Sequence, residues 1–351
     1  RFSSQSRWRA EYLYSIPNHI INMKENFGLG ETTQIFKGLR PKIIYIDHHL
    51  AHAAGGYYQS GFKNASFFVA DGRGERHTAS WGICNANKIK VLNTVNYPNS
   101  LGLFYSMITQ FLGFVPDSDE WKVMALAAYG TFRKNKFINK INEIIKINKD
   151  GKFTLNLNYC GFHQPDVHGK KFYSEEFIKL IGIPPRKKGE ILSSDHKNLA
   201  WACQYVFEES LFQILKILHK TQNQKNLILS GGCFMNSVFN GKVIKNTPFK
   251  NVYVGPCPDD SGISVGAALW GYYNNKPKGK RYHINNNNWG PEYKKDTEKI
   301  LKKFKLNYIK LEDPSITAAQ LLNNGKIIGW FQGRMEFGQR ALGNRSILAD
   351  P

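Results

Sequence analysis

Three histidines, His48, His49 and His52, lie within five positions of the segment IDHHLAHAAGG. Residues four apart in a helix share a face, so His48 and His52 would point the same way, and His49 would be rotated off by about a quarter turn. Two imidazoles on one helical face can clamp a metal ion. A pair of surface or core histidines has the same spacing, so this segment alone leaves both interpretations open.

Two glycine-rich turns follow apolar runs that are typical of strands. Asp71 stands at the end of the first run, in VADGRGE, and Gly72 and Gly74 follow it. Gly231 and Gly232 follow the second run, in LSGGCFMN, at the start of an expected helix. Backbone N–H groups in such turns and helix starts can bind phosphate or a metal-bound anion. An ordinary hairpin turn explains the first stretch equally well.

A further pair of carboxylates, Asp259 and Asp260, comes directly before small helical residues in PDDSGISVGAAL. A carboxylate at this position can reach a ligand, but aspartate and serine also cap helices routinely.

The elements that must position these residues alternate between strand and helix. A buried strand is expected at 42–47, a helix from there to Gly61, and a meander of three strands at 65–71, 78–84 and 88–95. Helices are expected at 100–114, 120–130, 134–148 and 196–221, and strand–turn–helix units at 226–243 and 252–273. The polar stretch 274–291 is typical of a connector, and two helices and a strand at 326–331 follow it. This order predicts an α/β fold.

Composition limits the classes of protein. The chain has 351 residues, 42% of them hydrophobic, and a formal net charge of +21, which favours an anionic partner or a solvated lysine-rich surface. The lysines are scattered, which argues against a nucleic-acid-binding tail. Five cysteines without a CxxC pair indicate reduced thiols in the cytoplasm, and no apolar run is long enough to span a membrane. The chain begins at Arg1 and stops just after a predicted strand, so we expect a fragment.

The order of the motifs is more specific than any one of them. DHHLAHAA, DGRGE, EWKVMALAAYG, SGGCFMNSVFN, PDDSGISVGAALWG and GRMEFGQRALGNRSILADP follow one another from about residue 42 to the end. In this order they resemble the O-carbamoyltransferases of the nodulation-protein U and cephalosporin carbamoyltransferase type (NodU/CmcH-like).

The resemblance implies two domains. Residues 1–273 would form an actin-like domain of the sugar-kinase and Hsp70 ATPase type, lacking its N-terminal part. Residues 274–291 would be a linker, and residues 292–351 the beginning of a truncated YrdC-like α/β domain. The implied activity is ATP-dependent carbamoyl transfer: carbamoyl phosphate and ATP give carbamoyl adenylate, and the carbamoyl group passes to a hydroxyl of a small-molecule acceptor such as a sugar or secondary metabolite.

The resemblance also implies the site residues. His48, His52, Asp71 and Asp260 would bind a divalent metal, with Fe(II) preferred and Mn or Zn as alternatives, and His49 would stay outside the ligand set. Nucleotide-binding positions would be Gly72, Gly74, Gly231, Gly232 and Asn236. Lys122 would neutralise phosphate as a catalytic residue, or else form a structural salt bridge with Asp119 or Glu120. Arg334, Arg340 and Arg345 would bind carbamoyl phosphate or ATP at a site distinct from the metal, because three such charges repel one another without an anion between them.

Two other functions remain open at this stage. One is a tRNA threonylcarbamoyl transferase of the same fold, which the basic charge favours and the fused arginine-rich segment opposes. The other is a non-catalytic ATP-binding scaffold, which loss of the metal ligands would indicate. We expect no membrane partner and no nucleic-acid partner, and a homodimer is compatible with the sequence.

Overall fold

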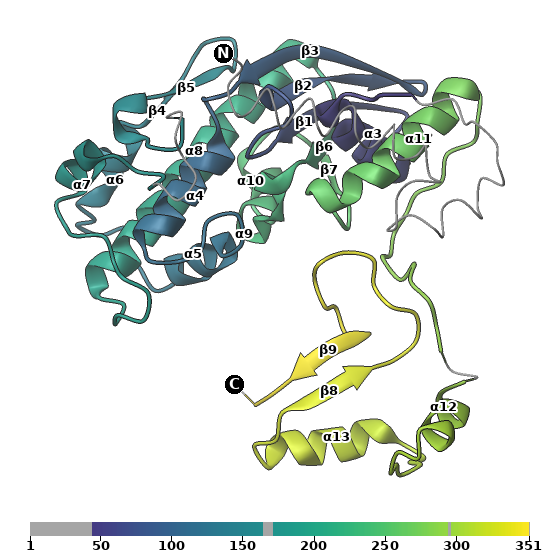
Figure 1. Ribbon diagram of the computed structural model, residues 1–351. Helices are drawn as coiled ribbons and strands as arrows, with labels where there is room; N and C mark the ends of the chain where they lie inside the picture. The colour runs from purple at the N-terminus through teal and green to yellow at the C-terminus, as the bar shows by residue number, and fades with distance from the viewer. Residues whose placement is uncertain (1–43, 164–170, 294–295, 351) are drawn as a thin grey trace, which may run out of the picture.

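The computed structural model describes residues 44–163, 171–293 and 296–350, and its centre is a five-stranded mixed sheet (Figure 1). The strand order is β3-β2-β1-β6-β7. The first three strands form the predicted antiparallel meander, whereas β6 and β7 run parallel to β1. The bounds are β1 Asn64–Ala70, β2 His77–Asn85, β3 Lys88–Asn96, β6 Asn226–Ser230 and β7 Asn251–Val254. The predicted α/β class is therefore confirmed as a mixed-sheet fold.

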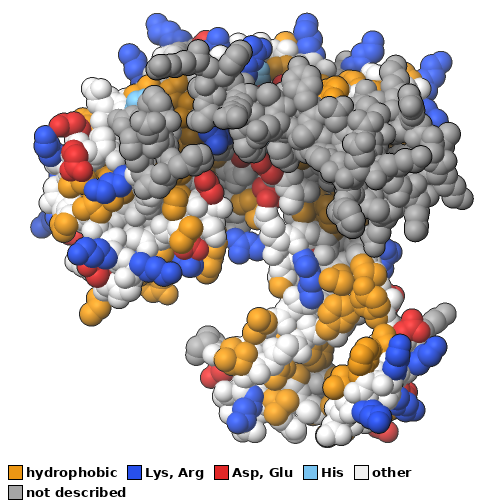
Figure 2. Space-filling view, in the orientation of Figure 1, with side chains coloured by type: hydrophobic (Ala, Val, Ile, Leu, Met, Phe, Trp, Pro, Cys, Tyr) orange, Lys and Arg blue, Asp and Glu red, His pale blue; other side chains and the backbone are white. Residues whose placement is uncertain are grey.

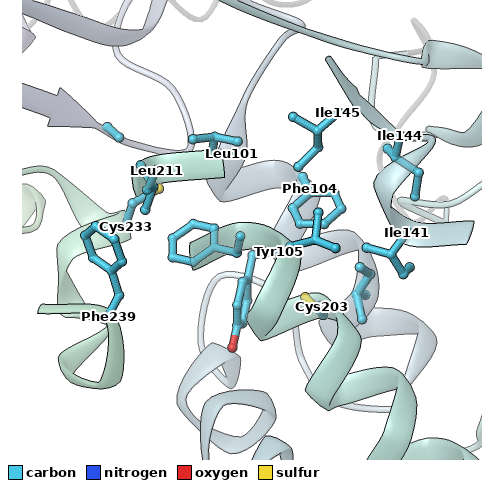
Figure 3. Packing of buried hydrophobic residues seen from close by; sticks show 14 of the residues in the cluster. Leu101, Phe104, Tyr105, Ile141, Ile144, Ile145, Cys203, Leu211, Cys233 and Phe239 are labelled. Atoms are coloured by element: carbon cyan, nitrogen blue, oxygen red, sulfur yellow. The ribbon is translucent and has the colours of Figure 1, made fainter. Parts of the chain in front are cut away.

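Helices cover both faces of the sheet. Side chains along each strand alternate between the two faces, and both faces carry apolar side chains. On one face, Phe67 and Val69 of β1 pack with Tyr57 of α3 (His48–Ser60) and Tyr273 of α11 (Ile263–Asn275). On the other face, Phe68 and Ala70 belong to the larger core. That core includes side chains of α4 (Leu101–Phe111) and α8 (Ser194–Gln222). Figure 3 shows Phe104 and Tyr105 of α4 near Cys203 of α8.

The prediction of one helix over residues 134–148 is wrong. The structure has a short helix, α6 (Phe137–Asn142), followed by strand β4 (Ile145–Ile147), which pairs with β5 (Phe153–Leu155). Ile145 and Ile147 alternate with a lysine, and β-branched side chains suit a strand better than a helix. The rest of this region comprises α5 (Glu120–Ala127), η2 (Leu157–Tyr159) and α7 (Glu175–Ile181).

The segment before α3 also differs from its prediction. Residues 44–47 belong to no strand, and residues 42–43 lie outside the described part of the chain. Asp47 instead caps α3, its carboxylate accepting a hydrogen bond from the backbone N–H of Leu50 at 3.0 Å. The cap sets the start of the helix at His48.

The parallel strands β1, β6 and β7 end at one edge of the sheet. Asp71 follows β1, Gly231 follows β6, and Asp260 lies in the loop after β7. Loops beyond the carboxyl ends of parallel strands commonly carry ligand-binding residues. The short elements in these loops are η3 (Gly232–Met235), α9 (Ser237–Asn240), α10 (Val243–Asn246) and η4 (Asp260–Gly262).

Helices α3 and α11 cross with their backbones nearly in contact. A Cβ added to Gly266 of α11 would lie 1.9 Å from the carbonyl oxygen of Ala51, and a Cβ added to Gly55 of α3 would lie 3.5 Å from the Cα of Gly266. Gly56 permits an equally close approach of α3 to the sheet, since its added Cβ would lie 2.4 Å from Ile228 of β6. Only glycine permits this crossing, which brings the N-terminal end of α11 to the start of α3.

The C-terminal residues form a smaller body below the sheet (Figure 1). It contains α12 (Thr297–Lys303), α13 (Pro314–Asn323) and the hairpin β8 (Ile328–Phe331) with β9 (Arg345–Leu348), which includes the predicted helices and strand. The irregular stretch after Asn275 is hydrogen-bonded to the end of α3, with His283 Nδ1 2.8 Å from the carbonyl of Ser60. Division of the chain into domains at this stretch stays a proposal.

Two expectations from composition concern thiols and membranes. All five cysteines are free, and four of them are buried. Within residues 44–163, 171–293 and 296–350, no helix is both long enough and apolar enough to cross a bilayer.

The helix crossing yields a stability prediction. Gly266→Ala should lower the free energy of unfolding by about 1–3 kcal/mol, because the new methyl group must push Ala51 away. Gly271→Ala on the same helix is the matched control. Apart from its chain neighbours and the backbone of its own helix, nothing lies within 4 Å of its added Cβ, so this change should be neutral or slightly stabilising. Urea unfolding measures both, and equal effects of the two substitutions would contradict the close crossing.

Candidate metal centre

Four side chains from three segments converge at the carboxyl edge of the sheet. The Nε2 atoms of His48 and His52 lie 3.1 Å apart, and each lies 3.2 Å from Oδ2 of Asp71 and 3.3 Å from Oδ1 of Asp260. All four ligand atoms lie within 4.8 Å of one another. The side chain of His52 is 1% exposed, whereas that of Asp260 is 63% exposed, so the cluster is buried on one side and open on the other.

The spacing of these atoms fits a shared cation. Ligands about 2.1 Å from one ion stand roughly 3.0–3.4 Å apart at octahedral or tetrahedral angles, and the measured distances of 3.1–3.3 Å fall in that interval. Two imidazoles and two carboxylates form a hard-to-borderline ligand set. The residues therefore fit the metal ion that the sequence led us to expect, and metal binding itself is a proposal.

Backbone groups hold the Asp71 carboxylate in its orientation. Its Oδ1 accepts hydrogen bonds from the N–H of Gly72 at 2.7 Å and of Gly232 at 3.3 Å, which leaves Oδ2 directed at the histidines. Gly231 has φ +101°, and a Cβ on it would lie 2.2 Å from the carbonyl oxygen of Ala70. A Cβ on Gly232 would lie 2.9 Å from Oδ1 of Asp71. These glycines thus allow the turn after β6 to approach Asp71.

The turn after β6 is also hydrogen-bonded to the loop that contains Asp260. Pro258 donates no backbone N–H, but its carbonyl accepts from the N–H of Gly231 at 2.6 Å and from the hydroxyl of Ser230 at 3.3 Å. The same hydroxyl lies 3.5 Å from Nδ1 of His52. Ser230 was not among the predicted site residues, although it precedes the quoted glycine pair.

His49 points away from the cluster, as the helical spacing predicted. Its Nδ1 lies 2.7 Å from the hydroxyl of Ser80 on β2, and its ring is 1% exposed. Burial, together with the neighbouring histidines, lowers the pKa of His49 to about 3. It is therefore neutral near pH 7, unlike His48.

The cluster histidines are held in their charged form by the carboxylates. Burial lowers the pKa of His48, but hydrogen bonds to Asp260 and Asp71 outweigh it and raise the pKa to about 10. The same causes raise the pKa of His52. Burial raises the pKa of Asp71, yet hydrogen bonds from both histidines bring it well below its usual value. Without a metal, the carboxylates thus favour protonation of the imidazoles, which offsets their own negative charge.

Lys122 and Asn236 have protein partners in the structure. Lys122 Nζ lies 2.9 Å from Oδ1 of Asp119, which is the salt bridge weighed as the alternative for this residue. The Asn236 side chain exchanges hydrogen bonds with Gln204 at 2.8 and 3.0 Å and caps α9 by accepting from the N–H of Phe239 at 3.0 Å. Neither side chain contacts the four-residue cluster.

The three C-terminal arginines differ from one another. Arg334 donates to the carbonyls of Trp289 and Gly290 at 3.0 Å, and Arg345 pairs with Glu336 at 3.2 Å. Arg340 is exposed, and no hydrogen bond or ion pair engages it within the described part of the chain. The three arginines were expected to repel one another unless an anion lay among them. Glu336 and the carbonyls of Trp289 and Gly290 reduce that repulsion.

The structure thus combines a mixed α/β sheet with a cluster of two histidines and two carboxylates at one sheet edge. Comparison with known families then places the sequence. A model described as the carbamoyltransferase N-terminus matches residues 9–269, and one described as the carbamoyltransferase C-terminus matches residues 319–351. The chain belongs to the carbamoyltransferase family, as its motifs predicted.

Individual relatives agree with this placement. The chain is 33% identical to an uncharacterized Synechocystis protein, sll1178, over 89% of this chain and 51% of the relative. It is 31% identical to nodulation protein NolNO of Sinorhizobium fredii, over 88% and 44%. A 3'-hydroxymethylcephem-O-carbamoyltransferase of Streptomyces clavuligerus is 35% identical over 35% of this chain and 23% of the relative. The chain thus spans about half the length of the first two relatives.

Among solved structures, full-length HypF in its phosphate- and nucleotide-bound form is similar to the chain. The similarity covers 72% of this chain and 46% of HypF, with 15% identity and a TM-score of 0.40. Likeness at that level establishes neither the fold nor the activity of this chain.

Proton release gives a test of the centre. At pH 8 His48 is protonated in the metal-free protein, because this pH lies below its pKa of about 10. Binding of Mn(II) should therefore release the proton of His48, about one proton per ion, and affinity should rise with pH up to about 10. Calorimetry in buffers of different ionisation enthalpy counts the protons. Asp260→Asn should reduce the count at pH 8, and binding without proton release would contradict the assigned ligands.

Proposed function

We propose that the chain forms the carbamoyl-transferring part of a longer carbamoyltransferase. In this proposal the complete protein makes carbamoyl adenylate from carbamoyl phosphate and ATP, and the carbamoyl group passes to a hydroxyl of a small-molecule acceptor. Family membership supports the reaction class. The names of the cephem O-carbamoyltransferase relatives support a hydroxyl as acceptor. The observation that carries the proposal is the convergence of His48, His52, Asp71 and Asp260.

The metal in this proposal is a divalent ion, with Fe(II) preferred and Mn or Zn as alternatives. When bound, it would act as a Lewis acid toward the carbonyl or phosphate oxygens of the adenylate. The chain's own contribution is geometric. Two backbone N–H groups fix the Asp71 carboxylate, and His52 is buried. These two side chains therefore need little rearrangement when the metal ion binds. The exposed Asp260 leaves one side of the centre accessible.

The nucleotide would lie on the open side of the turn after Asp71. Apart from its two chain neighbours, no residue has a heavy atom within 4 Å of a Cβ added to Gly72, whereas the added Cβ of Gly74 would be 3.2 Å from the ring of His48. Gly72 therefore has room for a ligand beside the centre, while Gly74 packs against a metal ligand. Gly231, Gly232 and Asn236 complete the proposed nucleotide positions, and Lys122 would have to leave Asp119 in order to neutralise a phosphate.

The architecture proposed for the longer protein follows the family resemblance. The sheet domain would be of the actin-like ATPase type, and the C-terminal body would begin a YrdC-like domain that forms the adenylate. Arg340 is the arginine of the three that is free to bind an anion. Carbamoyl transfer and adenylate formation would then occur in different parts of the complete protein.

Removal of one metal ligand tests the proposal. In the complete protein, Asp71→Asn should lower bound metal and reduce carbamoyl transfer from preformed adenylate by about 100-fold or more. Carbamoyl phosphate-dependent ATP turnover should persist, because it belongs to the other domain. Metal analysis and the two assays separate these effects.

The matched control is His77→Asn. The ring of this histidine lies 6.0 Å from that of His49, outside the cluster, and is hydrogen-bonded to Asn96, so metal content and transfer should stay normal. Full transfer activity of Asp71→Asn without metal would refute the proposal.

A further inference from the structure

A small cavity lies beside the metal centre, between α3, β6 and the segment that follows β7. It measures about 10 Å³ and is lined mainly by glycines and apolar side chains, to which His52, Gln59 and Ser230 add polar groups. In the space-filling view the C-terminal body joins the sheet domain on one side only (Figure 2), and Phe337 of that body also lines the cavity. A cavity of this volume holds about one water molecule, provided that polar groups surround it.

The ring of His52 has one nitrogen in the cluster and the other near Ser230. Its Nε2 lies 3.2 Å from Oδ2 of Asp71 and 3.3 Å from Oδ1 of Asp260, whereas its Nδ1 lies 3.5 Å from Oγ of Ser230. A neutral imidazole that binds a cation through Nε2 carries its proton on Nδ1. That N–H needs an acceptor within the protein, because the His52 side chain is 1% exposed.

The hydroxyl of Ser230 can act toward His52 only as an acceptor. Its proton is donated to the carbonyl oxygen of Pro258, 3.3 Å away, because a carbonyl has no proton to give. The lone pairs of Oγ remain available to the Nδ1–H of His52. At 3.5 Å this contact is at the limit of a hydrogen bond, so Ser230 by itself holds the ring only weakly.

Gln59 supplies a second acceptor to the same cavity. It follows His52 by seven residues in α3, and two turns of helix place both residues on one face. Its backbone carbonyl accepts from the N–H of Ile284 at 2.9 Å, which fixes this end of the helix. Its side-chain carbonyl oxygen is buried and has no hydrogen-bond partner within the part of the chain that the structure describes. A buried acceptor without a partner is costly, so a donor is expected beside it.

We propose that the cavity is the site of one ordered water molecule, and that Gln59 and Ser230 are positioning residues that hold the ring of His52 through it. The water accepts a hydrogen bond from the Nδ1–H of His52 and donates its two protons to Oε1 of Gln59 and Oγ of Ser230. Three polar partners are typical of a buried water. The lone pair on Nε2 of His52 is thereby kept available to a cation in the cluster. This inference rests on the proposed function, since it concerns the orientation of a metal ligand.

Metal affinity of the complete protein tests the two positioning residues, with Zn(II) as the probe and a competing chelator to measure its binding. Ser230→Ala and Gln59→Leu should each weaken Zn(II) binding by roughly tenfold or more, the effect of losing a group that orients a metal ligand. Because both residues act through one water, the double variant should bind little more weakly than the weaker single variant. Unchanged affinity in both single variants would overturn the inference, and so would a double loss equal to the product of the two single losses.

Two buried polar side chains outside the cavity provide matched controls. The hydroxyl of Ser66 on β1 and the side-chain oxygen of Gln222 at the end of α8 are both buried without a hydrogen-bond partner among the described residues. Ser66→Ala and Gln222→Leu remove the same chemical groups and should leave Zn(II) affinity unchanged. A loss in these controls as large as in the test variants would assign the effect to general packing and reject the positioning role.

Two measurements on the unsubstituted protein examine the hydrogen bonds themselves. In nuclear magnetic resonance of the Zn(II)-loaded protein with isotope-labelled histidine, His52 should carry a slowly exchanging proton on Nδ1, and Gln59→Leu should accelerate its exchange. A high-resolution crystal structure should show one water within hydrogen-bond distance of Gln59 and Ser230. Failure of the unsubstituted protein to bind a divalent metal would refute the proposed function itself. Intact metal binding with a dry cavity, or with a rapidly exchanging Nδ1 proton, would overturn only this inference.

Discussion

Charge neutralisation at one sheet edge is the constraint on which the rest of the structure depends. Asp71 and Asp260 face two imidazoles at 3.2–3.3 Å, and His52 and Asp71 are largely removed from water. A buried carboxylate such as Asp71, with a second carboxylate beside it, would be costly without compensation. Either protonation of the histidines or one divalent cation can supply that compensation. The raised pKa of His48 and the lowered pKa of Asp71 both express this balance.

Glycines allow the backbone segments around this cluster to approach one another closely. Gly266 lets α11 approach α3 closely enough for the loop before it to reach His48 and His52, and Gly231 and Gly232 let the turn after β6 approach Asp71. Each approach brings backbone donors or acceptors to the centre as well as side chains. The small residues in the motifs therefore have a packing role that is separate from the nucleotide binding proposed for them.

The C-terminal segment is coupled to this edge through contacts with the residues next to Asp260. Gln339, Gly338 and Phe337 all touch the loop or cavity beside the centre, while Glu336 holds their loop together. Such contacts link the position of the smaller body to the surroundings of a candidate ligand.

The sequence by itself determined what short-range spacing controls. The four-residue separation of His48 and His52, the meander β1–β3 and the placement of Asp71 at a strand end all follow from local periodicity, and the family follows from motif order. Only the tertiary structure decided that Ser230 lies 3.5 Å from His52, that residues 134–148 split into helix and strand, and that Arg345 pairs with Glu336. These outcomes depend on which distant surfaces pack together, and local periodicity carries no information about such contacts.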